Sequence, residues 1–310
     1  MSIVTDKAVA AKAVPAVSPP SSPWRRFVAE FAESKLAMGG LILFVLLALA
    51  SILAPLIAPQ DPYDLAQLDI FDVRLPPGSV SEGSGLTYWL GSDAQGRDML
   101  SAILYGLRVS LMVGAISVVV AMSLGLAVGL GAAYFGGRID AVLMRLVDIQ
   151  LGFPAILVAL ILLSVVGQGI DKVMIALIVV QWAYFARLAR GAALVERHRE
   201  YVEAATSLAL PAWRIVFRHI MPNVLPPLIV YATVRIAEAV ALEATLSFLG
   251  VGVPVTEPSL GLLLRNGFGY LMSGDYWISF FPGAALALAI IAINLVGDQL
   301  RDMLNPRLKR

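Results

Sequence analysis

The sequence predicts an all-α membrane protein with six transmembrane helices, and two observations support this. Of the 310 residues, 59% are hydrophobic and 15% are charged, whereas soluble domains carry about 25% charged residues. Four uncharged runs also reach the length of about 20 apolar residues that a helix needs to cross a bilayer. A soluble core of this chain length could not bury so much apolar surface, so we place the chain in the membrane.

The predicted spans follow from the positions of the apolar runs. The four uncharged runs cover residues 36–58, 109–137, 149–170 and 276–297, and two further spans cover residues 173–186 and 220–253. The run 173–186 is short, so we expect flanking polar residues to enter the membrane interface. The run 220–253 is long enough but contains Arg235, Glu238 and Glu243.

The positive charges predict the orientation of these spans. With a cytosolic N-terminus, 17 Lys and Arg residues fall in cytosolic segments and 4 fall on the opposite side. Such an excess is typical of the cytosolic side of a membrane protein. We therefore expect both termini to be cytosolic.

This topology divides the chain into five segments. Residues 1–35 form a cytosolic N-terminal tail, mostly disordered because its Pro- and Ser-rich lead has no apolar patch to bury, and residues 36–58 form the first span. Residues 59–106 form an acidic external segment ending in an interfacial helix, which Asp98 is placed to cap. A five-helix core (107–302) contains a cytosolic loop at 187–222, and a cytosolic tail (303–310) follows.

Composition and motifs exclude several classes of function. The net charge of +1 excludes a nucleic-acid binder that works by bulk charge. The chain has no cysteine, and its two histidines, His198 and His219, are too far apart for a histidine metal cage. It also lacks the Gly-x-x-x-x-Gly-Lys-[Ser/Thr] loop that cradles ATP phosphates.

The loop 187–222 is unusually long, basic and rich in helix formers. Small residues cluster at 204–207, and Pro211 suits the first turn of a new helix. A helix with small side chains lets another backbone approach closely, so one interpretation is a docking surface for a partner protein. The other is an amphipathic loop that rests on anionic lipid.

The same loop resembles the EAA loop of binding-protein-dependent ABC importer permeases. That pattern is Glu-Ala-Ala, three residues, Gly, nine residues, then Ile, any residue, Leu and Pro. Its spacing matches Glu203-Ala204-Ala205, Ala209 and His219-Ile220-Met221-Pro222. Ala209 replaces a Gly that would permit a positive φ, so either the turn has another geometry here or Ala209 is strained by roughly 1 kcal/mol.

The resemblance extends over most of the chain after residue 35 and indicates the C-type permease of dipeptide and oligopeptide importers. The external Asp93, Gly96, Arg97 and Asp98 match the signature of that group, and Asp148 lies in a further matching segment. Peptides are the usual substrate of these importers. Near relatives carry nickel chelates, glutathione, opines or antimicrobial peptides, and the sequence leaves this choice open.

The resemblance implies an ABC type I importer permease fold, a location in the bacterial inner membrane, and a set of partners. These are a second, B-type permease that completes a heterodimer, two ABC ATPase subunits that hold ATP and Mg²⁺, and a periplasmic binding protein. No cofactor is expected on this chain. The implied ATPase-coupling residues are Glu203, Ala204, Ala205, Ser207, Leu208, Ala209, Arg214, His219 and Pro222, with Ala204, Ala205 and Ser207 forming one low-profile docking face.

The charges within the spans are the candidates for contact with a solute. Charged side chains at membrane depth are costly unless they are paired or reach water, so they usually face a cavity or a partner. Arg235 and Glu238 are three residues apart on one predicted helix and could neutralise each other. Together with Glu243 and Asp148, they are expected to line the translocation path or the interface with the second permease. For Glu243, which lies in a segment that matches the family and near the external end of its span, gating or packing is the expected role.

Two other interpretations remain from the residues alone. A self-contained secondary transporter would use the intramembrane carboxylates as proton sites, but such carriers often contain two similar halves, which this sequence lacks. A membrane scaffold protein would use the long external segment. Within the second span, Gly125 and Gly129 form a Gly-x-x-x-Gly pattern that either packs closely on another helix or is incidental among 26 glycines.

The predicted topology is testable with reporter fusions. We expect a reporter at Arg310 and one at Thr206 to be cytosolic, and one at Gly83 to be external, because an even number of spans returns the chain to its starting side. Accessibility of each reporter to an impermeant reagent measures this. A cytosolic reporter at Gly83 would contradict the six-span topology.

Overall fold

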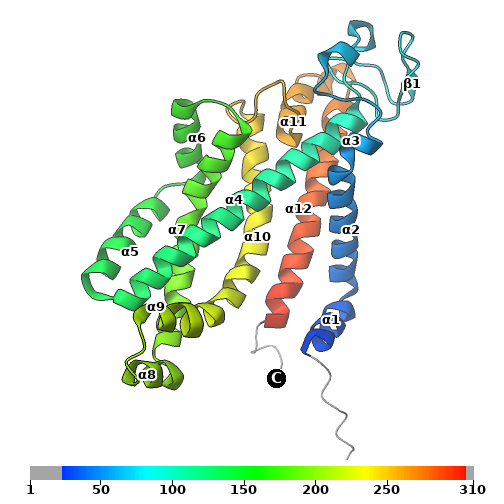
Figure 1. Ribbon diagram of the computed structural model, residues 1–310. Helices are drawn as coiled ribbons and strands as arrows, with labels where there is room; N and C mark the ends of the chain where they lie inside the picture. Colours follow the sequence, from blue (N-terminus) through cyan, green and yellow to red (C-terminus); the bar gives the residue numbers. More distant parts are fainter. Residues whose placement is uncertain (1–22, 305–310) are drawn as a thin grey trace, which may run out of the picture.

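The computed structural model describes residues 23–304 as a bundle of helices with a small loop region at one end (Figure 1). The order is α1 (Pro23–Glu33), α2 (Lys35–Ile52), α3 (Ala54–Ile57), η1 (Leu65–Gln67), η2 (Ile70–Asp72), β1 (Ser79–Val80), β2 (Thr87–Tyr88), α4 (Met99–Phe135), α5 (Gly137–Leu151), α6 (Ala155–Val166), α7 (Ile170–Arg197), α8 (Glu200–Ser207), α9 (Ala212–Ile215), the π-helical turn η3 (Val216–Ile220), α10 (Met221–Phe248), α11 (Leu260–Phe268), η4 (Leu271–Ser273) and α12 (Trp277–Leu304). β1 and β2 form one antiparallel hairpin.

Five helices are long and apolar enough to cross a membrane, and α5 with α6 forms a bent sixth candidate. This confirms the all-helical prediction. The predicted number of six spans is reached when α5 and α6 are counted together as one span. The start of α1, the end of α12 and α8 lie at one end of the bundle, and the β hairpin lies at the other (Figure 1). We refer to these as the α8 end and the hairpin end.

Two expected boundaries are wrong. The predicted span 149–170 breaks at residues 152–154, where the two helices meet at 88°, because Pro154 lacks an N–H and disfavours helical geometry at Phe153. The interfacial helix expected before residue 107 is not separate, since α4 runs without a break for 37 residues from Met99. Nothing in the sequence of its first turns interrupts the helix that Asp98 caps.

The expected N-terminal tail is only partly described. Residues 1–22 and 305–310 lie outside the described part of the chain, and so does most of the predicted disorder. The remainder of the tail is the helix α1, which lies against α12: Phe31 is buried, and the Gln299 side chain donates a hydrogen bond of 3.4 Å to the Glu30 carbonyl. The described end of this tail is therefore packed on the bundle.

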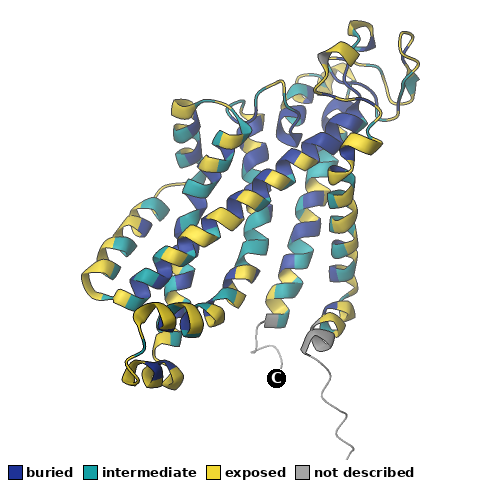
Figure 2. Cartoon of the chain, in the orientation of Figure 1, coloured by how far each residue is buried: buried dark blue, intermediate teal, exposed yellow. Residues whose placement is uncertain are grey.

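The most extensive helix packing is between α4 and α7. A Cβ atom added at Gly125 would lie 2.5 Å from the Phe185 Cβ and 2.6 Å from the Trp182 carbonyl oxygen, and one at Gly129 would lie 2.6 Å from the Ala186 carbonyl oxygen. Figure 2 shows buried positions along α4 where it crosses the other helices, while α5 and α8 are largely exposed. The Gly-x-x-x-Gly pattern is thus a packing contact.

This contact predicts different effects for two matched glycines of α4. We expect Gly125→Ala to lower the free energy of unfolding by about 1–3 kcal/mol, because the new methyl overlaps the α7 backbone. Gly131→Ala meets nothing within 4 Å and should be neutral or stabilising by up to about 1 kcal/mol, since Ala is the better helix former. Thermal unfolding in detergent measures both. Equal stabilities would contradict close α4–α7 packing.

Candidate functional site: a coupling loop and a buried arginine

The predicted external signature forms a buried turn before α4. Asp93 Oδ2 accepts a hydrogen bond of 2.7 Å from Arg97 Nε, and both side chains are at most 2% exposed. Gly96 has φ +77°, and a Cβ there would lie 2.5 Å from the Asp69 carbonyl oxygen, so no other residue fits without strain. Asp98 accepts from the backbone N–H and the hydroxyl of Ser101 at 2.7 and 2.6 Å and caps α4.

These four residues fasten the external loop to the bundle. Burial raises the pKa of the Asp98 carboxyl, and its hydrogen bonds with Ser101 act in the opposite direction. The Trp277 indole at the start of α12 donates a hydrogen bond of 3.1 Å to the Ser92 carbonyl in the same turn. The turn joins the starts of α4 and α12 and exposes almost none of its charge to a ligand.

The loop between α7 and α10 is held by the phenol of Tyr201, which sequence analysis missed. Its hydroxyl donates a 2.5 Å hydrogen bond to Glu196 at the end of α7. The Asn223 amide on α10 donates to the Tyr201 oxygen and to the His219 carbonyl, each at 2.9 Å. Burial, and then the bond to Glu196, raise the pKa of Tyr201, so the phenol stays protonated. α7, α8 and α10 therefore meet at one side chain.

The helix α8 turns two different faces to its surroundings. Val202 and Ala205 are buried with Ile215 and Ile220 in an apolar cluster of the loop. The outer face carries exposed residues, which are Glu203, Ala204, Ser207 and Leu208. The expectation that Ala205 belongs to the docking face with Ala204 and Ser207 is wrong, because the helical period turns Ala205 inward.

Ala209 follows α8 with φ +55°. The Leu210 N–H bonds the Ala205 carbonyl at 3.2 Å, and the Ala209 N–H bonds the Thr206 carbonyl at 2.9 Å. This pair of bonds is a Schellman motif, in which the residue after the C-cap is left-handed and is usually Gly. Of the two alternatives left open by the sequence, the structure has the strained one.

The other coupling candidates lie around this turn. Arg214 on α9 is exposed, and its guanidinium lies 5.6 Å from the Trp213 ring centroid. His219 is half-buried in η3. Pro222 is exposed in the first turn of α10, directly after the π-helical turn η3. All three lie in the segment that runs from α8 into the first turn of α10.

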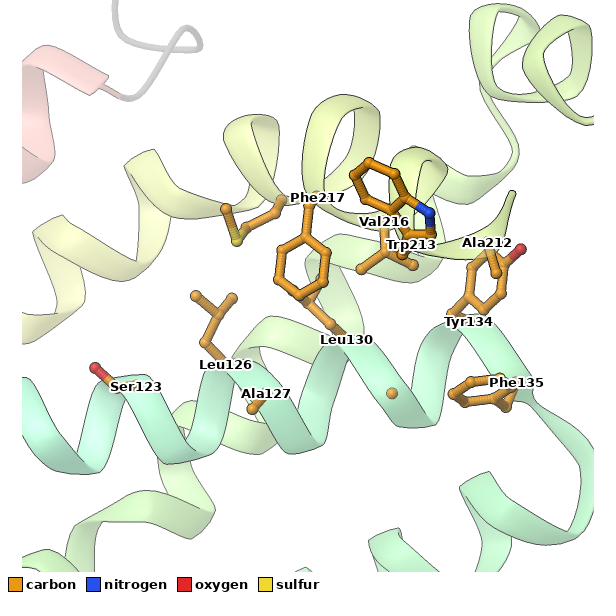
Figure 3. Close-up of a pocket in the computed structure, with 12 residues that line it drawn as sticks. Ser123, Leu126, Ala127, Leu130, Tyr134, Phe135, Ala212, Trp213, Val216 and Phe217 are labelled. Atoms are coloured by element: carbon orange, nitrogen blue, oxygen red, sulfur yellow. The ribbon is translucent and has the colours of Figure 1, made fainter. Parts of the chain in front are cut away.

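A groove of about 640 Å³ lies between the loop and the end of α4 (Figure 3). Trp213 and Phe217 from the loop and Leu126, Leu130 and Tyr134 from α4 are among its lining residues. No charged side chain lines it. This groove suits hydrocarbon and offers nothing to bind a charged solute.

Arg235 on α10 lies in an aromatic cage. Its guanidinium carbon is 3.8 Å from the Tyr184 ring centroid and 4.8 Å from the Tyr231 ring centroid. It also donates hydrogen bonds to the Tyr231 hydroxyl and to Glu238, which confirms the predicted pair. The Arg235 side chain is 12% exposed, whereas that of Glu238 is 55% exposed.

A cavity of about 730 Å³ lies beside this cage and is lined by Tyr184, Tyr231 and Arg187, with Gly191 and Ala192 among the remaining wall residues. Arg187 forms an ion pair of 2.5 Å with Asp148 on α5. The structure thus brings Asp148 near the same cavity as Arg235. Gln181, one turn before Tyr184 on α7, is buried, and its amide has no hydrogen-bond partner among residues 23–304.

Glu243 is separate from this cluster and fully buried. It accepts hydrogen bonds from Ser110 on α4 at 2.6 Å and Ser247 on α10 at 2.9 Å, and it also hydrogen-bonds with Ser259 before α11. These partners lie on or next to three different helices, so the carboxylate joins α4, α10 and α11. Within the described residues, no group of His, Asp and Glu side chains is arranged to hold a metal ion.

Comparison with known proteins identifies the family. Residues 122–310 match the model of binding-protein-dependent transport system inner membrane components, and residues 22–77 match the N-terminal transmembrane domain of oligopeptide transport permease C. The chain belongs to this family of ABC importer permeases. In such importers ATP hydrolysis is performed by separate ATPase subunits, and the alternative of a self-contained secondary transporter is not favoured.

The relatives cover nearly the whole chain. The di/tripeptide transport system permease protein DppC of Pseudomonas aeruginosa is 37% identical over 93% of each chain. The glutathione transport system permease protein GsiD of Pectobacterium atrosepticum is 36% identical over 93% of this chain and 92% of its own. A permease of the MetNI methionine ABC transporter in inward-facing conformations has a TM-score of 0.54 at 19% identity, over 67% of this chain and 98% of its own. That likeness shows the permease fold.

The strain at Ala209 predicts a local effect. We expect Ala209→Gly to stabilise the loop by about 0.5 kcal/mol, because relief of roughly 1–2 kcal/mol of left-handed strain exceeds the added chain entropy of about 0.4–1 kcal/mol. Hydrogen exchange of the amides at 206–210 measures it. Ala209→Val, with a branched Cβ, is the matched control and should exchange faster than the wild type. Slower exchange in the valine variant would contradict the left-handed turn.

Proposed function

We propose that this chain is the C-type permease subunit of a bacterial inner-membrane importer for di- or oligopeptides. The observation that carries the proposal is the similarity to peptide permeases such as the Pseudomonas aeruginosa protein over 93% of both chains. A second, B-type permease completes the pore, two ABC ATPases supply energy, and a periplasmic binding protein delivers the solute. The glutathione permease at 36% identity makes that tripeptide a related candidate.

The α8 end faces the cytosol in this proposal. Support comes from the excess of Lys and Arg in the segments at that end. α8 also lies at the same end of the bundle as the start of α1 and the end of α12 (Figure 1). The hairpin end then faces the periplasm, where the buried Asp93–Arg97 turn supports the surface that meets the binding protein.

The outer face of α8 is the proposed contact with the ATPase. Ala204 and Ser207 give it a low profile, Leu208 is 76% exposed at its end, and Glu203 adds one charge. Movement of α8 reaches the membrane helices because Tyr201 ties it to Glu196 on α7 and Asn223 on α10. The Schellman turn at Ala209 fixes the angle between α8 and the segment that leads the chain back to the membrane.

The cavity beside Tyr184 and Tyr231 is the proposed part of the translocation path. Arg187 lines this cavity and pairs with Asp148. Arg235 contacts the two tyrosines of its wall and pairs with Glu238, and charges of both signs near the cavity suit a zwitterionic peptide. Glu238 is 55% exposed although it lies within a candidate span, and such exposure of a carboxylate supports a water-filled path or a polar partner. Glu243 stabilises the helix arrangement around the path and does not contact the solute.

Reconstitution of the complete importer tests the function and its coupling. With binding protein and dipeptide, we expect ATP-dependent uptake and stimulated ATP hydrolysis by the wild type. Ala204→Trp should lower the stimulation about tenfold, because a bulky side chain at the centre of an interface separates the surfaces. Glu203→Ala should lower it only about twofold, since an exposed charge pair contributes about 0–1 kcal/mol.

The matched control is Ala205→Trp on the inner face of α8. Overpacking there should destabilise the loop by about 1–3 kcal/mol, seen as a lower thermal stability that Ala204→Trp does not share. Wild-type stimulation by the Ala204→Trp complex would overturn the docking face. Absence of peptide uptake by an intact wild-type complex would overturn the peptide function.

A further inference from the structure

Arg235 has a shell that holds the guanidinium but supplies little negative charge. The rings of Tyr184 and Tyr231 attract a cation through their faces and add no compensating charge. Arg235 Nε has no hydrogen-bond partner among residues 23–304. A cation within a membrane helix requires an anion nearby, and in the described structure Glu238 provides it.

Glu238 is a counter-ion that another anion could replace. It lies one helical turn from Arg235, and its side chain is more than half exposed, while Arg235 is 12% exposed. Exposed pairs at this spacing are weak, so Glu238 can rotate into water once another anion neutralises Arg235. Arg235 stays in place because the stacked rings and the Tyr231 hydroxyl hold it.

The space for a replacement anion lies beside the cage. Tyr184 and Tyr231 both contact Arg235 and line the cavity of about 730 Å³, which is within the usual range for small-molecule pockets. Gly191 and Ala192 leave room in the wall. A planar guanidinium is suited to bind a carboxylate with two parallel hydrogen bonds, and a free peptide carries such a carboxylate at its C-terminus.

We propose that Arg235 binds the carboxylate of the solute in transit, with the solute replacing Glu238 on the guanidinium and Glu238 returning when the solute leaves. This rests on the proposed peptide import and adds to it a residue that recognises one chemical group. Tyr184 and Tyr231 are positioning residues, because both contact the guanidinium and both line the cavity. Arg187 also lines the cavity, but its side chain is 56% exposed, so water and salt screen its charge more than that of Arg235, which is 12% exposed.

The test compares uptake of a dipeptide with uptake of its C-terminal amide in proteoliposomes containing the complete importer. The same binding protein is used throughout, so its own preference cancels when the acid-to-amide uptake ratio is compared between variants. We expect Arg235→Gln to lower this ratio about tenfold relative to the wild type, as for loss of a hydrogen-bonded charge. Glu238→Gln removes the competing carboxylate and should leave the ratio at or above the wild-type value.

The opposite behaviour of the two variants separates binding from a structural role. If the pair only stabilised the complex, both variants would impair uptake of acid and amide alike. Arg190→Gln is the matched control, because it breaks an ion pair with Asp140 between α7 and α5 away from the cage, and its ratio should equal that of the wild type. Arg235→Lys keeps the charge and loses the planar fork, so an intermediate ratio is expected.

Two results would overturn the proposal. One is a wild-type ratio in an Arg235→Gln complex that assembles and transports. The other is an acid-to-amide uptake ratio below the wild-type value in Glu238→Gln. This second result would overturn the proposal even if the Arg235→Gln complex does not assemble. A wild-type importer that is intact and carries neither peptide would instead overturn the proposed peptide function.

Discussion

The contact between α4 and α7 fixes the positions of the external turn and of the α8 loop relative to each other. Apolar helices in lipid gain no hydrophobic energy from meeting each other, so close packing by small residues has to hold them together. Gly125 and Gly129 provide it here, because their missing side chains admit the α7 backbone. The start of α4 carries the external turn at Asp98, and the end of α7 carries Glu196, which holds Tyr201. A shift of one helix on the other would therefore move the external loop relative to α8.

Two carboxylates on α10 show how the surroundings of a charge determine its role. Glu243 is enclosed by hydroxyl groups of its own chain and cannot reach a solute without breaking the α4–α10 contact. Glu238, less than two turns away, is held by one guanidinium and faces outward. The first joins two helices of this chain, and the second forms an exposed pair with one guanidinium. In the sequence both are acidic residues of the same apolar run, and the position of Glu243 near the external end of that run is what distinguishes them.

The sequence predicts most of the fold and part of the site. Features set by the local sequence are predictable, and those set by tertiary packing are not. The spans are set by the lengths of the apolar runs, so their number follows from the pattern of those runs along the sequence. The bend at Pro154 lies inside one such run, and apolar length alone does not reveal it. The EAA spacing locates the loop, but the inward direction of Ala205 depends on the phase of α8. The aromatic cage could not be predicted from the sequence, because Tyr184 and Arg235 lie on different helices and only tertiary packing brings them together.

The break between α5 and α6 makes this chain incomplete as a solitary membrane protein. At a rise of 1.5 Å per residue, the 15 residues of α5 and the 12 of α6 extend about 22 and 18 Å, each less than a bilayer core of about 30 Å. The turn between them lies near mid-height of the bundle (Figure 1), where helix ends leave peptide groups without internal partners. Hydrocarbon cannot satisfy such groups. This side of the protomer must consequently meet another polypeptide or water, and lipid alone cannot solvate it.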